Sequence, residues 1–293
     1  MKYILSNEHL EVEFTEFGGT LSSIKDKEGK EYLWQGDAAY WTGTAPVLFP
    51  ICGSIRDDKA VIGDGLTTEM PRHGIVRKSN FTFEGMSDDE IGFSIVSNEE
   101  TLKKFPFDYK LVMKYELSGK TVHITYEVEN TGEKDMPFFV GGHPGFKCPL
   151  TEGEAFSDYY LEFEKEENCT VPTPVTETGL IDVEHRVSCL NHAKTMDLKH
   201  ELFHKDAIIL DELQSRKIRL LSKKSCGGVE IDFPDFPYVI LWSTANDGPF
   251  IAIEPWVGLS TCSDENDVFE EKRNVQVVKP GEKKAYRYAI TIL

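Results

Sequence analysis

Three short segments of the sequence each carry an ionisable side chain beside glycine or proline. They are Met70–Gly74, which contains His73, Gly141–Phe146, which contains His143, and Ile253–Trp256, which contains Glu254. Glycine and proline let the backbone turn tightly, and glycine lets a ligand approach it closely. A histidine taken alone is more often structural or exposed than functional. Three such segments together form a candidate site in which a carboxyl group and an imidazole exchange protons with a substrate.

The surroundings of Glu254 favour a chemical role for its side chain. It ends the predicted apolar strand Phe250–Ile253 and, at the two-residue period of a strand, shares a face with Phe250 and Ala252. Apolar surroundings raise the pKa of a carboxyl group from about 4.3 toward the range of a general base near neutral pH. The alternative is an interior glutamate that an arginine or backbone amides satisfy, because buried carboxylates are usually paired.

The elements that position these segments are predicted to be strands, because apolar and polar residues alternate along much of the chain. The alternation is clearest in four segments, Leu10–Thr15, Leu111–Leu117, Thr121–Val128 and Tyr286–Ile292. Ser118, Gly119 and Lys120 separate the second from the third, which predicts a hairpin with a short turn. Helical periodicity is confined to Asn98–Phe105 and a short piece at Met196–Phe203.

Many strands at short spacing, separated by glycine and proline, predict an all-β fold: a large antiparallel β-sandwich with a few short helices. No linker rich in serine, glycine or proline and no block of like charge divides the sequence. We therefore expect a single domain over residues 1–293. The sequence lacks the internal repeats of a solenoid or a propeller.

Composition and charge exclude several classes of partner. The 32 lysines and arginines against 50 acidic residues give a net charge of −18, which repels nucleic acid and anionic membranes. The 6 cysteines are scattered without a C-x-x-C pair or a secretory leader, so we expect reduced thiols. Acidic residues interrupt the N-terminal region, and no run reaches the roughly 20 apolar residues of a membrane span. These features predict a cytoplasmic protein without membrane or nucleic-acid partners.

The three segments resemble the signature segments of the aldose 1-epimerase (mutarotase) family, in the family's order and at similar spacing. The matching strings are Met-Pro-Arg-His-Gly-Ile-Val-Arg at 70 to 77, Gly-Gly-His-Pro-Gly-Phe at 141 to 146, and Ile-Glu-Pro-Trp at 253 to 256. Pro50–Arg56 is similar to the family segment that supplies a sugar-binding arginine. The resemblance implies a galactose mutarotase-like supersandwich. It also implies an isomerase that interconverts the α and β anomers of a free hexose such as galactose or glucose.

The same resemblance implies a role for each site residue. Glu254 would remove the proton of the anomeric hydroxyl while His143 protonates the ring oxygen, which opens the sugar to its aldehyde. His73 would donate a hydrogen bond near the ring oxygen, and Arg56 would hold a sugar hydroxyl. Asp206 lies about where the family has a hydroxyl-binding aspartate, although the family's aromatic-Asp-His context is absent. An acid and a base suffice for this chemistry, so no cofactor is expected, in a monomer or homodimer.

Two rival interpretations belong to other classes. His200-Glu201-Leu202-Phe203-His204 satisfies the H-E-x-x-H pattern of zinc proteases. That motif requires a long helix and a third ligand, whereas here a strand-like segment, Ala207–Leu210, follows it. The second rival is a non-catalytic carbohydrate-binding protein of the same fold. A binding protein has no reason to keep an acid and a base together, which favours the enzyme.

Within the enzyme interpretation the substrate has two alternatives, because some relatives act on hexose 6-phosphates. Arg56, Arg72 and Arg77 are able in principle to gather around a phosphate. The net charge of −18 disfavours an anionic substrate, although a local cluster overcomes a distant field that salt screens. Free aldose is therefore the expected substrate, with Trp34, Trp41 and Trp256 as candidates for stacking on its apolar face.

Overall fold

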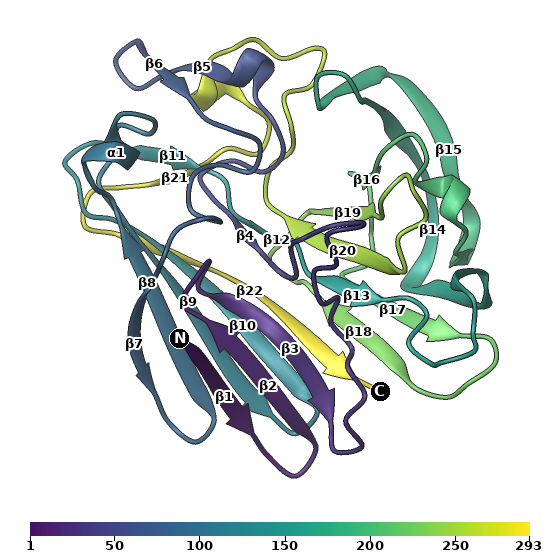
Figure 1. Cartoon of the computed structure of the whole chain (residues 1–293). Helices are drawn as coiled ribbons and strands as arrows, with labels where there is room; N and C mark the ends of the chain where they lie inside the picture. Colours follow the sequence, from purple (N-terminus) through teal and green to yellow (C-terminus); the bar gives the residue numbers. More distant parts are fainter.

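The computed structural model describes residues 1–293 and consists mainly of antiparallel strands (Figure 1). The strands are β1 (Lys2–Ser6), β2 (Leu10–Thr15), β3 (Thr20–Asp26), β4 (Val47–Leu48), β5 (Lys59–Ile62), β6 (Leu66–Glu69), β7 (Thr82–Met86), β8 (Glu90–Val96), β9 (Tyr109–Ser118), β10 (Thr121–Asn130), β11 (Met136–Phe138), β12 (Gly141–Gly142), β13 (Gly145–Lys147), β14 (Tyr159–Val175), β15 (Leu180–Asp197), β16 (Ile208–Leu210), β17 (Lys217–Ser222), β18 (Gly228–Asp232), β19 (Tyr238–Trp242), β20 (Phe250–Trp256), β21 (Gln276–Val278) and β22 (Lys283–Ile292). The helical pieces are α1 (Glu99–Leu102) and the 3-10 turns η1 (Arg56–Asp58), η2 (Phe156–Asp158), η3 (His200–Leu202) and η4 (Phe269–Glu271).

The largest layer is a nine-stranded sheet in the order β15-β14-β17-β18-β22-β10-β9-β8-β7. Strict alternation along β9 and β10 buries one face of each strand and leaves the other in solvent. Because the pairs Ser118–Thr121 and Leu117–Val122 face each other, the hairpin at Gly119 sets the register for both strands. The φ angle of Gly119 is +55°, a conformation that glycine adopts without strain.

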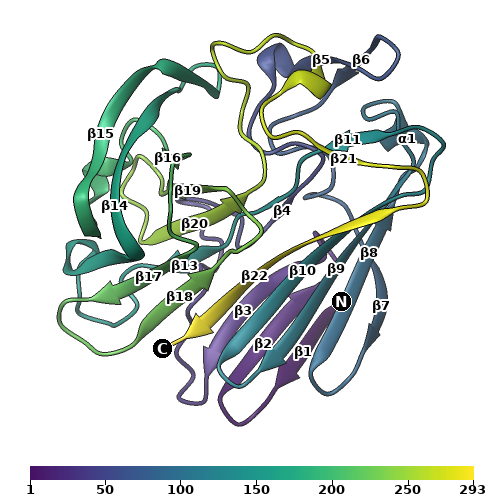
Figure 2. The same cartoon turned by 180° about the vertical axis from the view of Figure 1, so that it is seen from behind.

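The second layer covers the buried face of this sheet and is built from two smaller sheets (Figures 1 and 2). The three-stranded sheet β1-β2-β3 packs through Phe14 on Tyr115 of β9, with the ring centres 4.9 Å apart. The six-stranded sheet runs β16-β19-β20-β12-β4, with β13 also paired to β20. A Cβ atom on Gly142 of β12 would lie within 3.0 Å of the hydroxyls of Tyr126 and Tyr288, so glycine permits this close approach of the layers.

One connected cluster of 76 buried apolar residues fills the space between the layers. Strand β20 lies in the middle of the second layer, and all seven of its residues are buried. Apart from Glu254 the strand is apolar, as expected for a strand with neighbours on both sides and both faces buried. Strands β14 and β15 form a long hairpin at one end of the nine-stranded sheet. This hairpin curves beside β16 and β19 (Figure 2).

The structure confirms the predicted all-β fold and each of the four alternating strands. It corrects three details. The helix predicted over Asn98–Phe105 shrinks to Glu99–Leu102, capped by the Asn98 side chain. The piece at Met196–Phe203 is strand to Asp197 and then one 3-10 turn, because Met196 pairs with Leu161. Strand β20 continues past Glu254 to Trp256 instead of ending at Glu254. None of the helices has the length and apolarity needed to cross a membrane.

Candidate active site

A cavity of about 220 Å³ brings the three signature segments together. It lies at the central strand β20 and beside β19, the loop between β12 and β13, and the loop that follows β6. Eleven residues line it: Trp41, Arg72, His73, Arg77, His143, Asp206, Ala207, Ile240, Trp242, Glu254 and Trp256. The cavity therefore combines aromatic walls with acidic, basic and imidazole groups, as small-molecule sites usually do.

Strand register places His143 opposite Glu254. Gly141 pairs with Trp256, and Gly145 pairs with Ala252, in the same antiparallel register. Continued between these pairs, that register sets His143 against Glu254, and side chains of directly opposed residues lie on one face. His143 Nε2 is 3.3 Å from Glu254 Oε2, a contact that becomes an ion pair when the imidazole is protonated and the carboxyl group ionised.

Burial sets the protonation behaviour of this pair. Glu254 is only 1% exposed, and removal from water raises the pKa of its carboxyl group well above the usual value. Burial also lowers the pKa of His143 to about 3, and the charges of Arg77 and Arg72 act in the same direction. Both shifts favour the uncharged forms, in which Glu254 keeps its carboxyl proton. Moving that proton from Glu254 to His143 converts the neutral pair into an ion pair with the same total number of protons.

Aromatic rings fix the orientation of His143. Trp41 stacks on the imidazole with ring centres 4.7 Å apart, and Trp242 meets it edge-on at 5.6 Å. A Cβ atom on Gly145 would lie 2.8 Å from the Trp41 ring, so the second glycine of the G-H-P-G string makes the slot for that tryptophan. The backbone N–H of His143 donates to the carbonyl of Pro46. The imidazole is therefore held between two indoles and aimed at Glu254.

His73 is held in one tautomer by the backbone of the neighbouring loop. The N–H of Gly53 donates to His73 Nδ1 at 3.2 Å, so the ring proton lies on Nε2. Burial lowers the pKa of His73 well below its usual value, and the ring is neutral. Its φ angle is +69°, an uncommon conformation for a side-chain-bearing residue, which the bond from His73 N–H to Gly53 O supports. His73 is thus a neutral donor beside the acid–base pair.

Polar atoms without a partner concentrate in this cavity. Three of the six buried side-chain polar atoms that lack a hydrogen bond belong to its wall, namely His143 Nδ1, Glu254 Oε2 and Trp256 Nε1. Buried polar groups are nearly always hydrogen-bonded because desolvation without a partner costs about 1–3 kcal/mol each. Donors and acceptors left free in one cavity indicate a ligand rich in hydroxyl groups.

Comparison with known proteins identifies the family of this chain. The aldose 1-epimerase family model matches residues 1–291. The chain belongs to the aldose 1-epimerase family. The LacX protein (chromosomal) of Lactococcus lactis subsp. lactis is 48% identical over 294 residues, which cover 99% of this chain and 98% of that protein.

Two solved structures share the fold of this chain over its whole length. A galactose mutarotase related enzyme from Lactobacillus acidophilus superposes with a TM-score of 0.94 at 28% identity, covering 100% of this chain and 97% of the other. A galactose mutarotase-like protein from Lactobacillus casei gives a TM-score of 0.89 at 29% identity and covers 100% of both chains. These matches show that the architecture is that of the galactose mutarotase-like sandwich.

The aldose 1-epimerase fold gathers most, but not all, of the residues that the sequence singled out. Glu254, His143, His73 and Asp206 all line the cavity. Arg56 does not: it forms an ion pair with Asp267 and donates to the carbonyl of Glu265 at 3.1 Å. Its expected position beside the sugar is therefore corrected, because an acidic partner from a distant loop holds the guanidinium outside the cavity.

Other residues occupy the wall where Arg56 was expected. Arg72 and Arg77, from the segment that carries His73, both reach the cavity. Trp242 also lines it, and no feature of the sequence marked that residue, because it is one of several aromatic residues at strand ends. Its position follows only from the pairing of Trp242 with Ala252 in β20. Trp34 instead packs on Phe250 and does not line the cavity.

The H-E-x-x-H segment lies outside the site and is not on a long helix. His200–Leu202 is a single 3-10 turn. His200 stacks on Phe156 with ring centres 4.0 Å apart, and His204 Nε2 is 2.8 Å from Asp247. Nowhere in the chain do three or more histidine, cysteine or acidic side chains form a group able to hold a metal ion. The two histidines are thus engaged with separate partners, and the zinc-protease interpretation lacks its geometry.

Proposed function

We propose that the protein catalyses the interconversion of the α and β anomers of an aldohexose such as galactose or glucose, as an aldose 1-epimerase. The observation that carries this proposal is the buried contact of 3.3 Å between His143 Nε2 and Glu254 Oε2, inside a cavity with unpaired polar atoms. Membership of the family supports it. An acid and a base placed side by side are what ring opening of a cyclic sugar requires.

The reaction begins from the form of the pair in which the shared proton lies on His143. Glu254 accepts the proton of the C1 hydroxyl while His143 donates its proton to the ring oxygen. The bond between C1 and the ring oxygen breaks, and C1 becomes an aldehyde carbon. The pair is now in its other form, with the proton on Glu254 and His143 neutral. Rotation about the C1–C2 bond and reversal of the same proton transfers close the ring as the other anomer.

One property of the pair suits this cycle. Ring opening moves two protons, one from the C1 hydroxyl to Glu254 and one from His143 to the ring oxygen, so the pair holds the same number of protons before and after the step. Burial of Glu254 and His143 favours the uncharged form, which is the form that accompanies the open aldehyde. The site therefore stabilises the state of the pair that follows bond breaking.

The remaining wall residues position the sugar. The Nε2–H of His73 is a neutral donor next to His143, with the ring centres 5.6 Å apart, and we assign it to the ring oxygen or an adjacent hydroxyl. Asp206 and the free indole N–H of Trp256 supply an acceptor and a donor for further hydroxyls. The aromatic faces of Trp41 and Trp242 cover apolar C–H surface of the ring.

Polarimetry on freshly dissolved α-glucose and α-galactose tests the proposal directly. The protein is expected to accelerate the return to the equilibrium rotation in proportion to its concentration, with a chelator present throughout. The alternative, a carbohydrate-binding protein of the same fold, predicts heat of sugar binding in calorimetry without any acceleration. That result, with either sugar, would replace the enzyme by the binding protein.

A further inference from the structure

Ser260 lies beside the loop that holds His73 and takes no part in the proton transfers. It belongs to the segment that follows β20, and it is only 4% exposed. Its side-chain oxygen, Oγ, accepts the backbone N–H of Ser54 at 3.0 Å. Ser260 does not line the candidate active site, so its hydroxyl has no direct access to a sugar bound there. Any influence of this hydroxyl on the reaction must pass through the loop.

The peptide group between Gly53 and Ser54 is held at both ends. Its N–H, which belongs to Ser54, donates to Ser260 Oγ. Its carbonyl, which belongs to Gly53, accepts the backbone N–H of His73 at 2.7 Å. The following carbonyl, that of Ser54, accepts the N–H of Thr261 at 2.8 Å. Since the N–H of Gly53 that reaches His73 Nδ1 adjoins this peptide group, its direction depends on the same anchors.

Glycine at position 53 makes such an anchor necessary. Its φ angle is +72°, and a Cβ atom there would overlap the Oγ of Ser260, so only glycine fits against this hydroxyl. A glycine also moves readily between backbone conformations, because it has no side chain to restrict them. The peptide groups on either side of Gly53 are therefore free to rotate unless hydrogen bonds hold them. The buried bond from Ser54 N–H to Ser260 Oγ is one of these restraints.

Rotation of this loop would change which ring nitrogen of His73 carries the proton. The N–H of Gly53 keeps Nδ1 an acceptor and so places the ring proton on Nε2. If that N–H turned away, Nδ1 could carry the proton, and Nε2 would become an acceptor. The ring oxygen of a sugar has no hydrogen and can only accept. The role assigned to His73 at the ring oxygen therefore requires the tautomer that Gly53 selects.

A buried ion pair supports the segment that carries Ser260. Lys272 is only 5% exposed, and its Nζ lies 3.0 Å from Glu265 and donates to Thr261 Oγ1 at 2.9 Å. Glu265 also accepts the backbone N–H of Cys262 at 2.9 Å. A buried polar network whose members have partners makes the surrounding backbone rigid. Ser260 thus presents its hydroxyl to the loop from a fixed support.

From these contacts we propose that Ser260 is a positioning residue, whose hydroxyl holds the peptide group between Gly53 and Ser54 and thereby keeps His73 in the tautomer that donates from Nε2 to the sugar. The effect on turnover rests on the proposed 1-epimerase function, whereas the effect on the tautomer does not. No motif of the sequence marks Ser260, because its partner lies more than 200 residues away.

Long-range nitrogen–proton correlation NMR tests the tautomer, since protonated and unprotonated ring nitrogens have different shifts. His73→Gln assigns the signals of this ring. In Ser260→Ala we expect the two nitrogen shifts of His73 to move toward each other, as exchange between tautomers requires. Ser215→Ala is the matched control, because Ser215 is also buried, accepts a backbone N–H at 3.0 Å and lies outside the cavity. Unchanged His73 shifts in Ser260→Ala would overturn the proposal.

Amide hydrogen exchange of the native protein tests the same contact without any substitution. The N–H of Ser54 is expected to exchange as slowly as amides in the central strands of the sheets, because its acceptor is buried. Exchange as fast as that of an exposed loop amide would show that Ser260 does not hold the loop, and would refute its positioning role.

Kinetics measure the consequence for turnover. Ser260→Ala is expected to lower kcat for anomer interconversion about 5- to 10-fold with little change in KM, a factor that corresponds to the loss of one neutral hydrogen bond. Ser215→Ala is expected to leave kcat per folded molecule unchanged. A merely structural role of Ser260 would lower the amount of folded protein and leave both the tautomer of His73 and kcat per folded molecule as in the native protein.

The two readouts separate failure of this inference from failure of the proposed function. A change of His73 tautomer in Ser260→Ala, in a protein whose native form accelerates no sugar, would keep the positioning role and reject the 1-epimerase function. Acceleration by the native protein, with an unchanged tautomer in Ser260→Ala, would do the reverse.

Discussion

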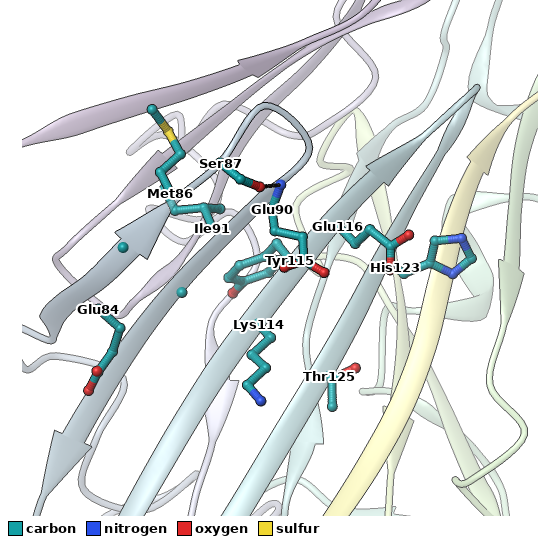
Figure 3. Close-up of a pocket in the computed structure, with 12 residues that line it drawn as sticks. Glu84, Met86, Ser87, Glu90, Ile91, Lys114, Tyr115, Glu116, His123 and Thr125 are labelled. Carbon is teal, nitrogen blue, oxygen red and sulfur yellow. Dashed lines mark hydrogen bonds between the residues drawn. The ribbon is translucent and has the colours of Figure 1, made fainter.

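Two hollows of this molecule differ in volume and in the side chains that line them. The larger, of about 470 Å³, lies on the outer face of the nine-stranded sheet over β7 to β10, and Figure 3 shows its charged side chains standing on neighbouring strands. The smaller, of about 220 Å³, is the candidate active site between β19, β20 and their loops. The outer hollow has the larger volume, whereas the inner one has the side chains expected of a functional site.

The outer hollow is a solvated strand surface on which several charges have partners. Lys114 pairs with Glu127 at 2.8 Å, and Lys110 pairs with Glu84 at 3.0 Å. Its depth arises where Gly85 has no atom within 4 Å of the position of a Cβ. In the inner cavity the ionisable groups are buried and several polar atoms lack partners. Groups that folding leaves buried and unpaired are thus a better mark of a functional site than open space.

The largest expected effect contrasts one glutamate from each hollow. Glu254→Gln is expected to lower kcat for anomer interconversion by about 10²- to 10⁴-fold, because an amide cannot accept the proton of the C1 hydroxyl. Glu116→Gln in the outer hollow makes the same chemical change at an exposed position and leaves kcat unchanged. Polarimetry at neutral pH measures both. Comparable loss in the two variants would contradict the choice of site.

The second contrast uses one histidine from each hollow. His143→Gln removes the group assigned to the ring oxygen and is expected to lower kcat about 10²- to 10³-fold, with a smaller change in KM. His123→Gln, on the exposed face of β10, is its matched control. A rise in KM at constant kcat for His143→Gln would instead make His143 a binding residue. Circular dichroism checks that both variants are folded.

Sequence patterns predicted the fold where the interactions are local. The alternation over Leu111–Leu117 and Thr121–Val128 is sufficient to define a hairpin, and the structure contains that hairpin in the expected register. The helix predicted over Asn98–Phe105 is too long, because the residues after Leu102 belong to a loop that continues into β9. A helix of four residues is too short for an apolar periodicity to predict its bounds.

The geometry of the candidate site was less predictable from sequence, because it depends on interactions between distant segments. His143 and Glu254 were identified from their motifs, but their contact depends on the pairing of β12 and β13 with β20, which are more than 100 residues apart in sequence. Arg56 was misplaced for the same reason, because its partner Asp267 comes from a loop whose position no local pattern defines. Residue types that chemistry requires can be read from sequence, whereas partners across the fold cannot.

Substitution of Trp41 tests how the inner cavity positions His143, the proposed acid. Its ring stacks on His143, so Trp41→Leu is expected to lower kcat about 10-fold by loosening the imidazole. Trp41→Phe keeps an aromatic face and is expected to restore most of the rate. If Trp41→Leu only destabilised the fold, it would lower the amount of folded enzyme. The predicted recovery of kcat per folded molecule in Trp41→Phe would then be absent. Polarimetry normalised to folded protein decides between the two.

The smallest expected effect is a gain of stability on removing the carboxyl group of Glu254, the proposed base. Burial raises the pKa of Glu254 in the folded protein, so the folded state binds more protons than the unfolded state above pH about 4.5, and its stability falls as pH rises. Glu254→Gln cannot ionise and escapes this loss. We expect its Tm to exceed that of the native protein by about 2–5 °C at pH 7, and by nothing near pH 4, where the carboxyl group is protonated in both states. Calorimetric scans at the two pH values measure the difference. A lower Tm for Glu254→Gln at pH 7 would mean that the ion-pair form of His143 and Glu254 predominates in the free enzyme, since the substitution would then remove a favourable charge from the buried imidazole.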